Sequence, residues 1–298
     1  MALNADLDSI RIRKKFFFRV AKDAGEYEKR VTPNAELLQK LRKRGADLFS
    51  FPERRWCSEV YEPQDSWAKS VENIALLNLN SYDEWLKRIG KKTRNMIRKS
   101  IRCGIRTAVV EPDERLAEGV WKIFSETPIR QGRVFSDYGI SLNRVMEELH
   151  SRKNFVHIGA YLRDELAGFI QLVEGENIER ILRILSLQRH WDKAVNNALI
   201  AKAVEVSASK GVKWMMYDKM GDFRHGPSCL SLEKFKRSNG FRRFQLTRYH
   251  IPITRKGALA VRLGLHKEMK ETLPPPAKYR IAAVYYWLSR SKIRVKAH

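Results

Sequence analysis

The loop between residues 127 and 139 brings together side chains that bind anionic and amine-bearing groups. It reads TPIRQGRVFSDYG. Arginines grip carboxylates and phosphates through pairs of parallel hydrogen bonds, and polar loops between helices often carry function. We therefore interpret the loop as a substrate-binding site, formed by Arg130, Gln131, Arg133, Asp137 and Tyr138. In the alternative, the arginines pair with neighbouring acids and the loop is structural.

Three residues beyond this loop have side chains suited to moving protons. Attack of an amine on a carbonyl requires that the amine lose a proton and that the leaving group gain one. Asp218 can accept the first proton, Tyr217 can supply the second, and His190 titrates near neutral pH. These three are the candidate catalytic residues, although a lone histidine and a tyrosine at a strand end are also common packing residues.

Two segments are suited to holding an anionic donor. Residues 87–106 contain nine lysines and arginines and no acid, a density that fits a phosphate backbone or, alternatively, a helix face exposed to water. The start of a helix near residue 193 offers free N–H groups and the positive end of the helix dipole, unless Asp192 simply caps it. The candidate donor-binding residues are Lys91, Lys92, Arg94, Arg98, Lys193, Asn196 and Asn197.

Composition limits the classes of function. The 298-residue chain carries 58 lysines and arginines against 34 acids, a formal net charge of +24, so we expect it to meet a polyanion or an anionic surface. Cys57, Cys103 and Cys229 lack the spacing of metal ligands, which argues against a metal site and a disulfide framework. No signal peptide or apolar run of about 18 residues is visible. We expect a cytoplasmic protein, with attachment to a membrane surface as an option.

The apolar periodicity predicts alternating strands and helices. Strands are expected at residues 74–80, 105–110, 155–162, 165–175, 178–187, 212–218 and 241–249. Helices are expected at residues 34–44, 81–104, 113–126, 141–151, 193–210 and 229–239, the second beginning at an N-cap Ser81 and ending at Gly104. This order predicts an α/β (α+β) fold, with a mixed, mostly antiparallel sheet flanked by helices.

We divide the chain into three parts. Residues 1–73 form an N-terminal segment that can belong to the main domain, and the prolines and aromatic residues between Pro52 and Trp67 indicate a packed loop within it. Residues 74–254 form the main domain. Residues 255–298 form a basic tail with an amphipathic stretch. Docking of that stretch on the core is the favoured interpretation, while an anionic membrane and RNA are the other possible partners.

The order of strands and helices resembles the GNAT acyltransferase fold. Three segments resemble the Fem-type (FemAB-like) transferases in particular: KKTRNMIRKSIRCGI, WDKAVNNALIAKAVEVSASKGVKWMMYD and SLEKFKRSNGF. The likeness covers roughly residues 74–250. GNAT enzymes that use acetyl-CoA carry a Gln/Arg-x-x-Gly-x-Gly/Ala loop, whereas residues 189–197 read RHWDKAVNN, without glycine. Fem-type relatives also lack these glycines, and several of them use aminoacyl-tRNA.

The resemblance implies an N-acyl or aminoacyl transferase with no permanently bound cofactor. The expected co-substrate is an acyl-CoA or an aminoacyl-tRNA, and the expected acceptor is an amine on a small molecule, a peptide or a cell-envelope precursor. Direct attack of the amine on the donor carbonyl is favoured over a covalent enzyme intermediate. Two alternatives remain: a non-catalytic RNA-binding protein and a peripheral membrane protein that use the same fold.

Overall fold

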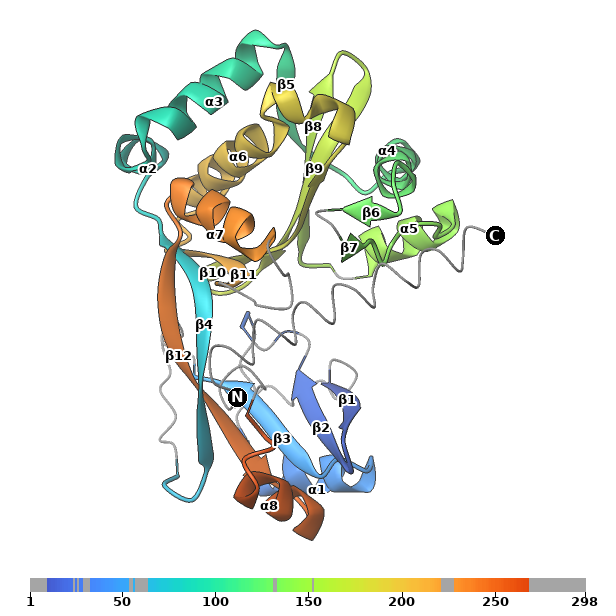
Figure 1. Ribbon diagram of the computed structural model, residues 1–298, viewed down its shortest axis with the longest axis vertical. Helices are drawn as coiled ribbons and strands as arrows, with labels where there is room; N and C mark the ends of the chain where they lie inside the picture. Colours follow the sequence, from blue (N-terminus) through green and yellow to red (C-terminus); the bar gives the residue numbers. More distant parts are fainter. Residues whose placement is uncertain are drawn as a thin grey trace. The chain divides into compact units, whose positions relative to one another are not determined.

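The computed structural model describes residues 10–23, 25, 27–28, 33–53, 56, 64–130, 133–151, 153–220 and 228–267. The chain divides into two compact units, which are described separately. Unit 1 comprises Met1–Ile74 and Phe244–Lys278, and unit 2 comprises Ala75–Arg243 and Tyr279–His298. The strands β4 (Ala68–Asn78) and β12 (Arg242–Pro252) each contribute residues to both units (Figure 1). Among the described residues, no helix is both long and apolar enough to span a bilayer.

Unit 1 contains a small mixed sheet. β1 (Ile10–Lys15) and β2 (Phe18–Asp23) form an antiparallel hairpin, β2 runs parallel to β3 (Leu48–Pro52), and β3 runs antiparallel to β12. We had predicted no strand in this part of the chain. The three strands are short, although Ile10 and Ile12 alternate with Arg11 and Arg13 in β1, which is the pattern of a half-buried strand.

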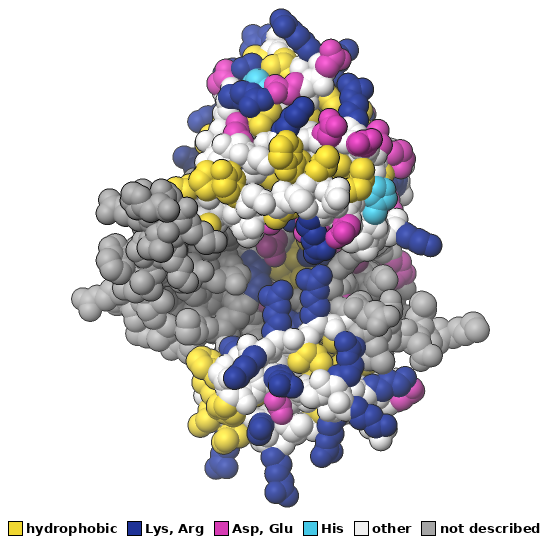
Figure 2. Space-filling model, turned by 90° about the vertical axis from the view of Figure 1, so that its right-hand side faces the viewer, with side chains coloured by type: hydrophobic (Ala, Val, Ile, Leu, Met, Phe, Trp, Pro, Cys, Tyr) yellow, Lys and Arg dark blue, Asp and Glu magenta, His cyan; other side chains and the backbone are white. Residues whose placement is uncertain are grey.

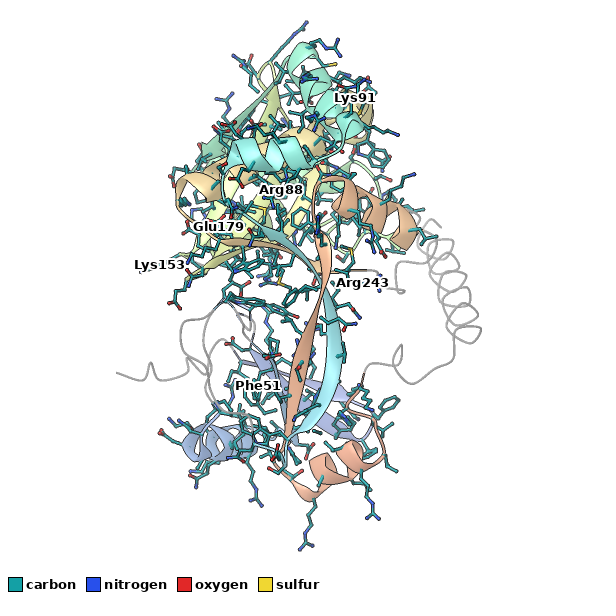
Figure 3. The ribbon with its side chains drawn as sticks, turned by 90° about the vertical axis from the view of Figure 1, so that its left-hand side faces the viewer. Phe51, Arg88, Lys91, Lys153, Glu179 and Arg243 are labelled. Atoms are coloured by element: carbon teal, nitrogen blue, oxygen red, sulfur yellow. The ribbon has the colours of Figure 1, made fainter. Side chains whose placement is uncertain are left out.

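Two helices cover this sheet. The predicted helix at residues 34–44 is confirmed as α1 (Ala35–Lys43), and the side chain of its N-cap Asn34 accepts a hydrogen bond from the Leu37 amide. The second helix, α8 (Arg255–Arg262), packs against β2. Gly257 makes this approach possible, since a Cβ there would lie 1.9 Å from the Asp47 carbonyl oxygen. Figure 3 shows Phe51 among the side chains of this unit, whose core also holds Phe49.

Unit 2 is built on a larger sheet. Its strand order is β4–β11–β10–β9–β8–β5. β5 (Ile105–Val110), β8 (Phe155–Leu162), β9 (Glu165–Glu174) and β10 (Ile178–Ser186) pair antiparallel in turn, and β10 pairs parallel with β11 (Trp214–Lys219). The predicted mixed, mostly antiparallel sheet flanked by helices is confirmed. Every strand predicted in this unit is present within a few residues of its predicted bounds, except that the strand predicted at residues 74–80 begins earlier, at Ala68.

Helices cover both faces of this sheet. One layer contains α2 (Tyr82–Arg88), α3 (Lys91–Arg102) and α6 (Val195–Ser209), and the other contains α4 (Glu114–Ser125) and α5 (Leu142–His150) (Figure 1). Successive side chains of β9 pack against the two helix layers: Phe169 packs with α4 and α5, and Ile170 packs with α6. The remaining elements are the short strands β6 (Ile129–Arg130) and β7 (Arg133–Val134), the 3-10 helix η2 (Gln188–Lys193) and the helix α7 (Ser228–Ser238).

One predicted helix is divided in two in the structure, and another begins two residues later than predicted. The helix predicted at residues 81–104 is two helices, because Ile89 and Gly90 adopt extended backbone. The predicted ends are confirmed: Ser81 accepts a hydrogen bond from the Glu84 amide, and Gly104 has a φ of +81°. The helix predicted at residue 193 begins at Val195, after Ala194 at a φ of +56°. Asp192 is therefore not its N-cap.

A buried polar cluster in unit 1 gives its stability a dependence on pH. His250 is almost fully buried, Ser70 Oγ lies 2.8 Å from its Nε2, and the ring of His266 is 4.9 Å away. Burial, followed by the positive charges of His266, Arg248, Lys22 and Lys15, lowers the pKa of His250 to about 2. The imidazole therefore stays neutral in the folded state throughout the range in which the unfolded chain binds a proton.

We predict that acid destabilises the protein through this histidine. Below about pH 6.5, the ordinary pKa of histidine, the unfolded state binds a proton at His250 and the folded state does not. The free energy of unfolding therefore decreases as the pH is lowered. The loss between about pH 7 and about pH 5 is roughly 2 kcal/mol. In urea unfolding at both pH values, His250→Gln, which can still bond to Ser70, should lose that much less than the wild type. Equal losses in both proteins would contradict the prediction.

Candidate functional site

The parallel pairing of β10 with β11 stops before either strand ends. The paired residues are Ile178 to Arg180 with Trp214 to Met216, although β10 continues to Ser186 and β11 to Lys219. β10 also shifts register between Ile181 and Arg183. We call residues 181–186 together with 217–219 the splayed end. An unpaired strand edge presents backbone N–H and C=O groups to a ligand, and parallel strands joined by a helix bind ligands beyond their carboxyl ends.

Lys236 of α7 is held at the splayed end. Its side chain is only 3% exposed, and its Nζ donates to the carbonyl oxygens of Tyr217 at 2.7 Å and Lys219 at 2.9 Å. The same Nζ lies 4.3 Å from the centre of the Tyr217 ring. An ammonium fixed where water is largely excluded can stabilise negative charge that develops on a reacting carbonyl oxygen.

We had not singled out Lys236 as a site residue. The sequence did contain a signal. Lys236 lies on the same face of α7 as Leu232 and Asn239, which is the face turned toward the core, and a lysine is rarely buried without a function or a partner. Lys236 also lies within SLEKFKRSNGF, one of the segments that carries the family resemblance.

The predicted residues Tyr217 and Asp218 both lie at the splayed end. Burial, and secondarily the charge of Asp218, raises the pKa of Tyr217, so its phenol stays protonated near neutral pH. Asp218 is exposed, and its backbone is left-handed with a φ of +47°. Backbone strain of this kind is concentrated at functional sites. Their catalytic roles remain predictions.

The structure gives His190 a different role from the one predicted. Its Nε2 lies 2.7 Å from Glu165 Oε2, and its Nδ1 is buried without a partner. Glu165 on β9 also accepts a hydrogen bond from Arg189, and the pKa of Glu165 is lowered mainly by the bond to His190. With one ring nitrogen engaged and the other buried, His190 attaches η2 to β9, and this geometry does not support proton transfer to a substrate.

The N-terminus of α6 meets the end of α7. Asn197 Nδ2 donates to Asn239 Oδ1 at 3.4 Å, and Asn196 Oδ1 is buried without a hydrogen-bond partner. Both predicted asparagines are therefore placed at this helix start. Lys193 bonds to the neighbouring Asp192. The Asn196 oxygen is a polar group left for a ligand or a water molecule.

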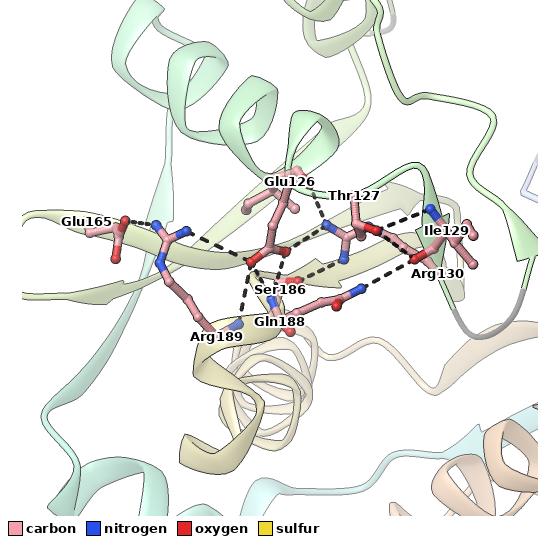
Figure 4. A network of polar contacts seen from close by, with 9 residues as sticks. Glu126, Thr127, Ile129, Arg130, Glu165, Ser186, Gln188 and Arg189 are labelled. Carbon is pink, nitrogen blue, oxygen red and sulfur yellow. Dashed lines mark hydrogen bonds and ion pairs between the residues drawn. The ribbon is translucent and has the colours of Figure 1, made fainter. Parts of the chain in front are cut away.

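A buried network holds the turn between β10 and α6 (Figure 4). Both carboxylate oxygens of Glu126 accept the Gln188 amide, at 2.8 and 2.7 Å, and Glu126 also accepts the Arg189 amide at 3.4 Å. This carboxylate occupies the first N–H groups of η2, where a phosphate would otherwise bind.

Arg130 supports this network instead of facing a substrate. It is 8% exposed and donates to the Ser186 carbonyl at 2.9 Å, to the Ile123 carbonyl, and to Glu126 at 3.3 Å. The predicted bidentate clamp is therefore wrong for Arg130, because its terminal nitrogens already bond within the chain. We had weighed this alternative, an arginine paired with a neighbouring acid.

Asp137 and Tyr138, the other described residues of the predicted site, have different surroundings. Asp137 pairs with Arg183 of β10 at 3.2 Å, and Tyr138 is exposed. Gln131 and the side chain of Arg133 lie outside the described residues. Of these two residues, Tyr138 is available to a ligand and Asp137 is held in an ion pair.

The predicted donor-binding helix is α3. Lys91, Lys92 and Arg98 are exposed on it, and Figure 3 shows Lys91 at its N-terminal end. No acidic partner of these three cations occurs in the described part of the chain. A hollow of about 620 Å³ runs along the helix, lined by Asn95, Met96, Arg98, Lys99, Ile101 and Arg102. Lys99 helps to lower the pKa of Asp192, which places the basic face of α3 near η2.

Arg94 does not belong to this exposed basic face. Its Nη1 donates to the carbonyl oxygens of Leu86 at 3.2 Å, Lys87 at 3.1 Å and Ile89 at 2.5 Å. These are the last carbonyls of α2, which lack partners inside the helix. Arg94 thus caps the preceding helix through Nη1, and its binding of a donor stays a prediction. Within the described residues, no cluster of potential metal ligands occurs.

Solved structures show which fold this arrangement shares. The chain superimposes on FemX with a TM-score of 0.55 at 10% identity, over 80% of this chain and 83% of that one. The TM-score is 0.53 for L-PGS from Bacillus licheniformis, at 15% identity over 85% of each chain. It is also 0.53 for the C-terminal domain of a protein described as a lysylphosphatidylglycerol synthetase from Agrobacterium fabrum, at 12% identity over 85% and 83%.

The chain has a GNAT-like fold of the Fem type. No protein-family model matches its sequence, and no curated protein does so either. The resemblance that we inferred from three sequence segments is thus confirmed for the fold. In this Fem-type fold Lys236 binds the end of β11, and Asn239, just after the same helix, contacts Asn197 at the start of α6.

We predict that Arg130 is needed for stability. Arg130→Ala removes the cationic partner of Glu126 and leaves the carbonyl groups of Ile123 and Ser186 without their buried donor, so it should lower the free energy of unfolding by about 3 kcal/mol. The matched control is Arg189→Ala, which removes a half-exposed arginine from the same carboxylate and should cost under about 1 kcal/mol. Urea unfolding measures both. Equal, small losses would show that Arg130 does not support the fold.

Proposed function

We propose that this protein is an acyl or aminoacyl transferase that joins a carbonyl donor to an amine by direct attack. The observation that carries the proposal is the buried ammonium of Lys236, held at the splayed end beside Tyr217 and Asp218. The fold supports it, because the name of one structural neighbour, a lysylphosphatidylglycerol synthetase, denotes attachment of a lysyl group.

The residues at the splayed end can carry each step of such a transfer. The amine nitrogen bonds to the donor carbonyl carbon, and Lys236 stabilises the charge that develops on the carbonyl oxygen. Asp218 takes the proton that the amine loses. The bond from the carbonyl carbon to the leaving oxygen or sulfur then breaks, and the Tyr217 phenol protonates the leaving atom. No bond between the donor and a side chain of the enzyme is required.

An aminoacyl-tRNA fits the site better than an acyl-CoA. The exposed cations of α3 have no acidic partners among the described residues, which suits a long phosphate backbone. The first amides of η2 already donate to Glu126, so they are not available to another anion. A pyrophosphate that relied on these amides would have to displace a buried carboxylate. The acceptor is proposed as an amine on a small molecule, a peptide or an envelope precursor.

Substitution of Lys236 tests the transferase. Lys236→Met should lower the rate of label transfer from charged tRNA to an amine by at least about 100-fold, since it removes the stabilising charge. Lys234→Met, on the exposed face of the same helix, is the matched control and should be unaffected. Thermal unfolding of both variants separates loss of chemistry from loss of fold. A well-folded Lys236→Met protein with wild-type transfer would refute the mechanism.

The α3 cations make a second, independent prediction about the donor. The triple variant Lys91→Gln, Lys92→Gln, Arg98→Gln should weaken tRNA binding and reduce the slope of log affinity against log salt by about 2 to 3. The same number of exposed charges removed at Lys122, Lys153 and Lys213 should change the slope little. Filter binding over a salt series measures both. Unchanged tRNA binding in the α3 variant would favour an acyl-CoA donor.

One observation favours a non-catalytic alternative, namely the density of exposed cations on α3. An RNA-binding protein would bind tRNA through that helix but perform no transfer. The two functions differ at Lys236, whose substitution abolishes transfer in an enzyme and leaves RNA binding intact in both cases.

A further inference from the structure

The turn of the β1–β2 hairpin in unit 1 consists of two exposed aromatic residues. Phe16 and Phe17 connect the paired residues Lys15 and Phe18, and they are 57% and 45% exposed. Phe16 has a φ of +54°. A two-residue hairpin turn favours glycine or asparagine at such a position, and a bulky residue there is a conformational outlier. The sequence thus keeps two phenylalanines where both the backbone and water disfavour them.

The flanking strands add charges that are also unfavourable for the isolated hairpin. Lys14 lies directly opposite Arg19 in the strand register, and both side chains are exposed. Like charges that face one another across a strand pair destabilise it. Neither residue has an acidic side-chain partner within the part of unit 1 that the structure describes.

The helix α8 extends this surface. Its Leu259 and Leu263 are 49% and 58% exposed, one turn apart, while Ala260 is buried against β2. Lys15 Nζ donates to the Lys267 carbonyl at 2.8 Å, which joins the hairpin to the segment after α8. Together, residues 10–23 and 255–267 hold ten lysines and arginines and one carboxylate, the buried Asp23. Figure 2 shows cationic side chains spread over this lower part of the molecule, with hydrophobic side chains exposed at its edge.

We propose that the β1–β2 turn and the outer face of α8 form a docking surface for an anionic lipid membrane. Apolar residues at a protruding turn enter the boundary between headgroups and acyl chains, and surrounding cations bind anionic headgroups. Phenylalanine can also stack on the bases of RNA, but the aliphatic Leu259 and Leu263 cannot. Strain and exposure at Phe16 have a physical reason if its ring is buried in lipid.

This surface is separate from the catalytic proposal. None of its residues contributes to the splayed end or to α3, so it holds even if the chain transfers nothing. It is also distinct from the amphipathic stretch of the C-terminal tail, which we considered as a membrane contact and which lies outside the described residues.

The test is flotation of the full chain with vesicles of three compositions: phosphatidylcholine alone, or with a minority of either phosphatidylglycerol or phosphatidylserine. The wild type should bind both anionic vesicles with similar affinity and leave the neutral vesicles unbound. Phe16→Gly with Phe17→Asn should weaken binding at least about tenfold, because two apolar side chains no longer insert. The melting temperature should stay equal or rise, because the new turn residues suit the backbone.

A charge variant tests the second part of the surface. Lys14→Gln with Arg19→Gln should weaken binding about fivefold for each charge removed. Lys122→Gln with Lys213→Gln, which removes the same charge from unit 2, is the control and should bind as the wild type does. Absence of vesicle binding by the wild type, or wild-type binding by the turn variant, would overturn the proposal. Loss of RNA binding in the turn variant, without any vesicle binding, would identify the surface as an RNA contact and overturn it as well.

Discussion

The early end of the pairing between β10 and β11 is the constraint on which the rest of unit 2 depends. Beyond Arg180 and Met216 the two strands separate, and other groups must satisfy the backbone that a neighbouring strand would have bonded. Lys236 meets this need at the end of β11, where its ammonium binds two carbonyl oxygens. In the transfer that we propose, the same contact fixes a positive charge beside the donor carbonyl. One interaction thus holds α7 in place and prepares the site electrostatically.

The buried and exposed cations of this strongly basic chain have different functions. Arg94 and Arg130 point into the protein and bind main-chain carbonyls at the ends of helices and strands. A guanidinium suits this role because its five N–H donors are fixed in a plane and can satisfy several oxygens at once. The lysines on the outer face of α3 have no such task, which leaves them available to an anionic ligand.

In unit 1 the turn between β1 and β2 has several features that are unfavourable for the stability of the hairpin. The pair Phe16–Phe17 combines a left-handed backbone with exposed aromatic rings, and the adjacent strands place cations opposite one another. These residues are unfavourable in a hairpin turn, whereas the adjacent residues Phe18 and Leu48 are apolar and buried in the core as expected. Such a concentration of violations is expected where a segment serves a partner, not the fold.

The sequence alone determined the order of elements in unit 2, since its strands and helices carry strong apolar periodicity and clear end signals such as Ser81 and Gly104. It also determined the likeness to the Fem-type fold. We did not predict β1 to β3 from it, because these strands are only five or six residues long. Nor did it reveal which charged residues are structural: Arg130 and Arg98 look equally available in the sequence. Only the tertiary structure decides, because burial and the position of distant carbonyl groups determine whether an arginine is already bonded or free to meet a ligand.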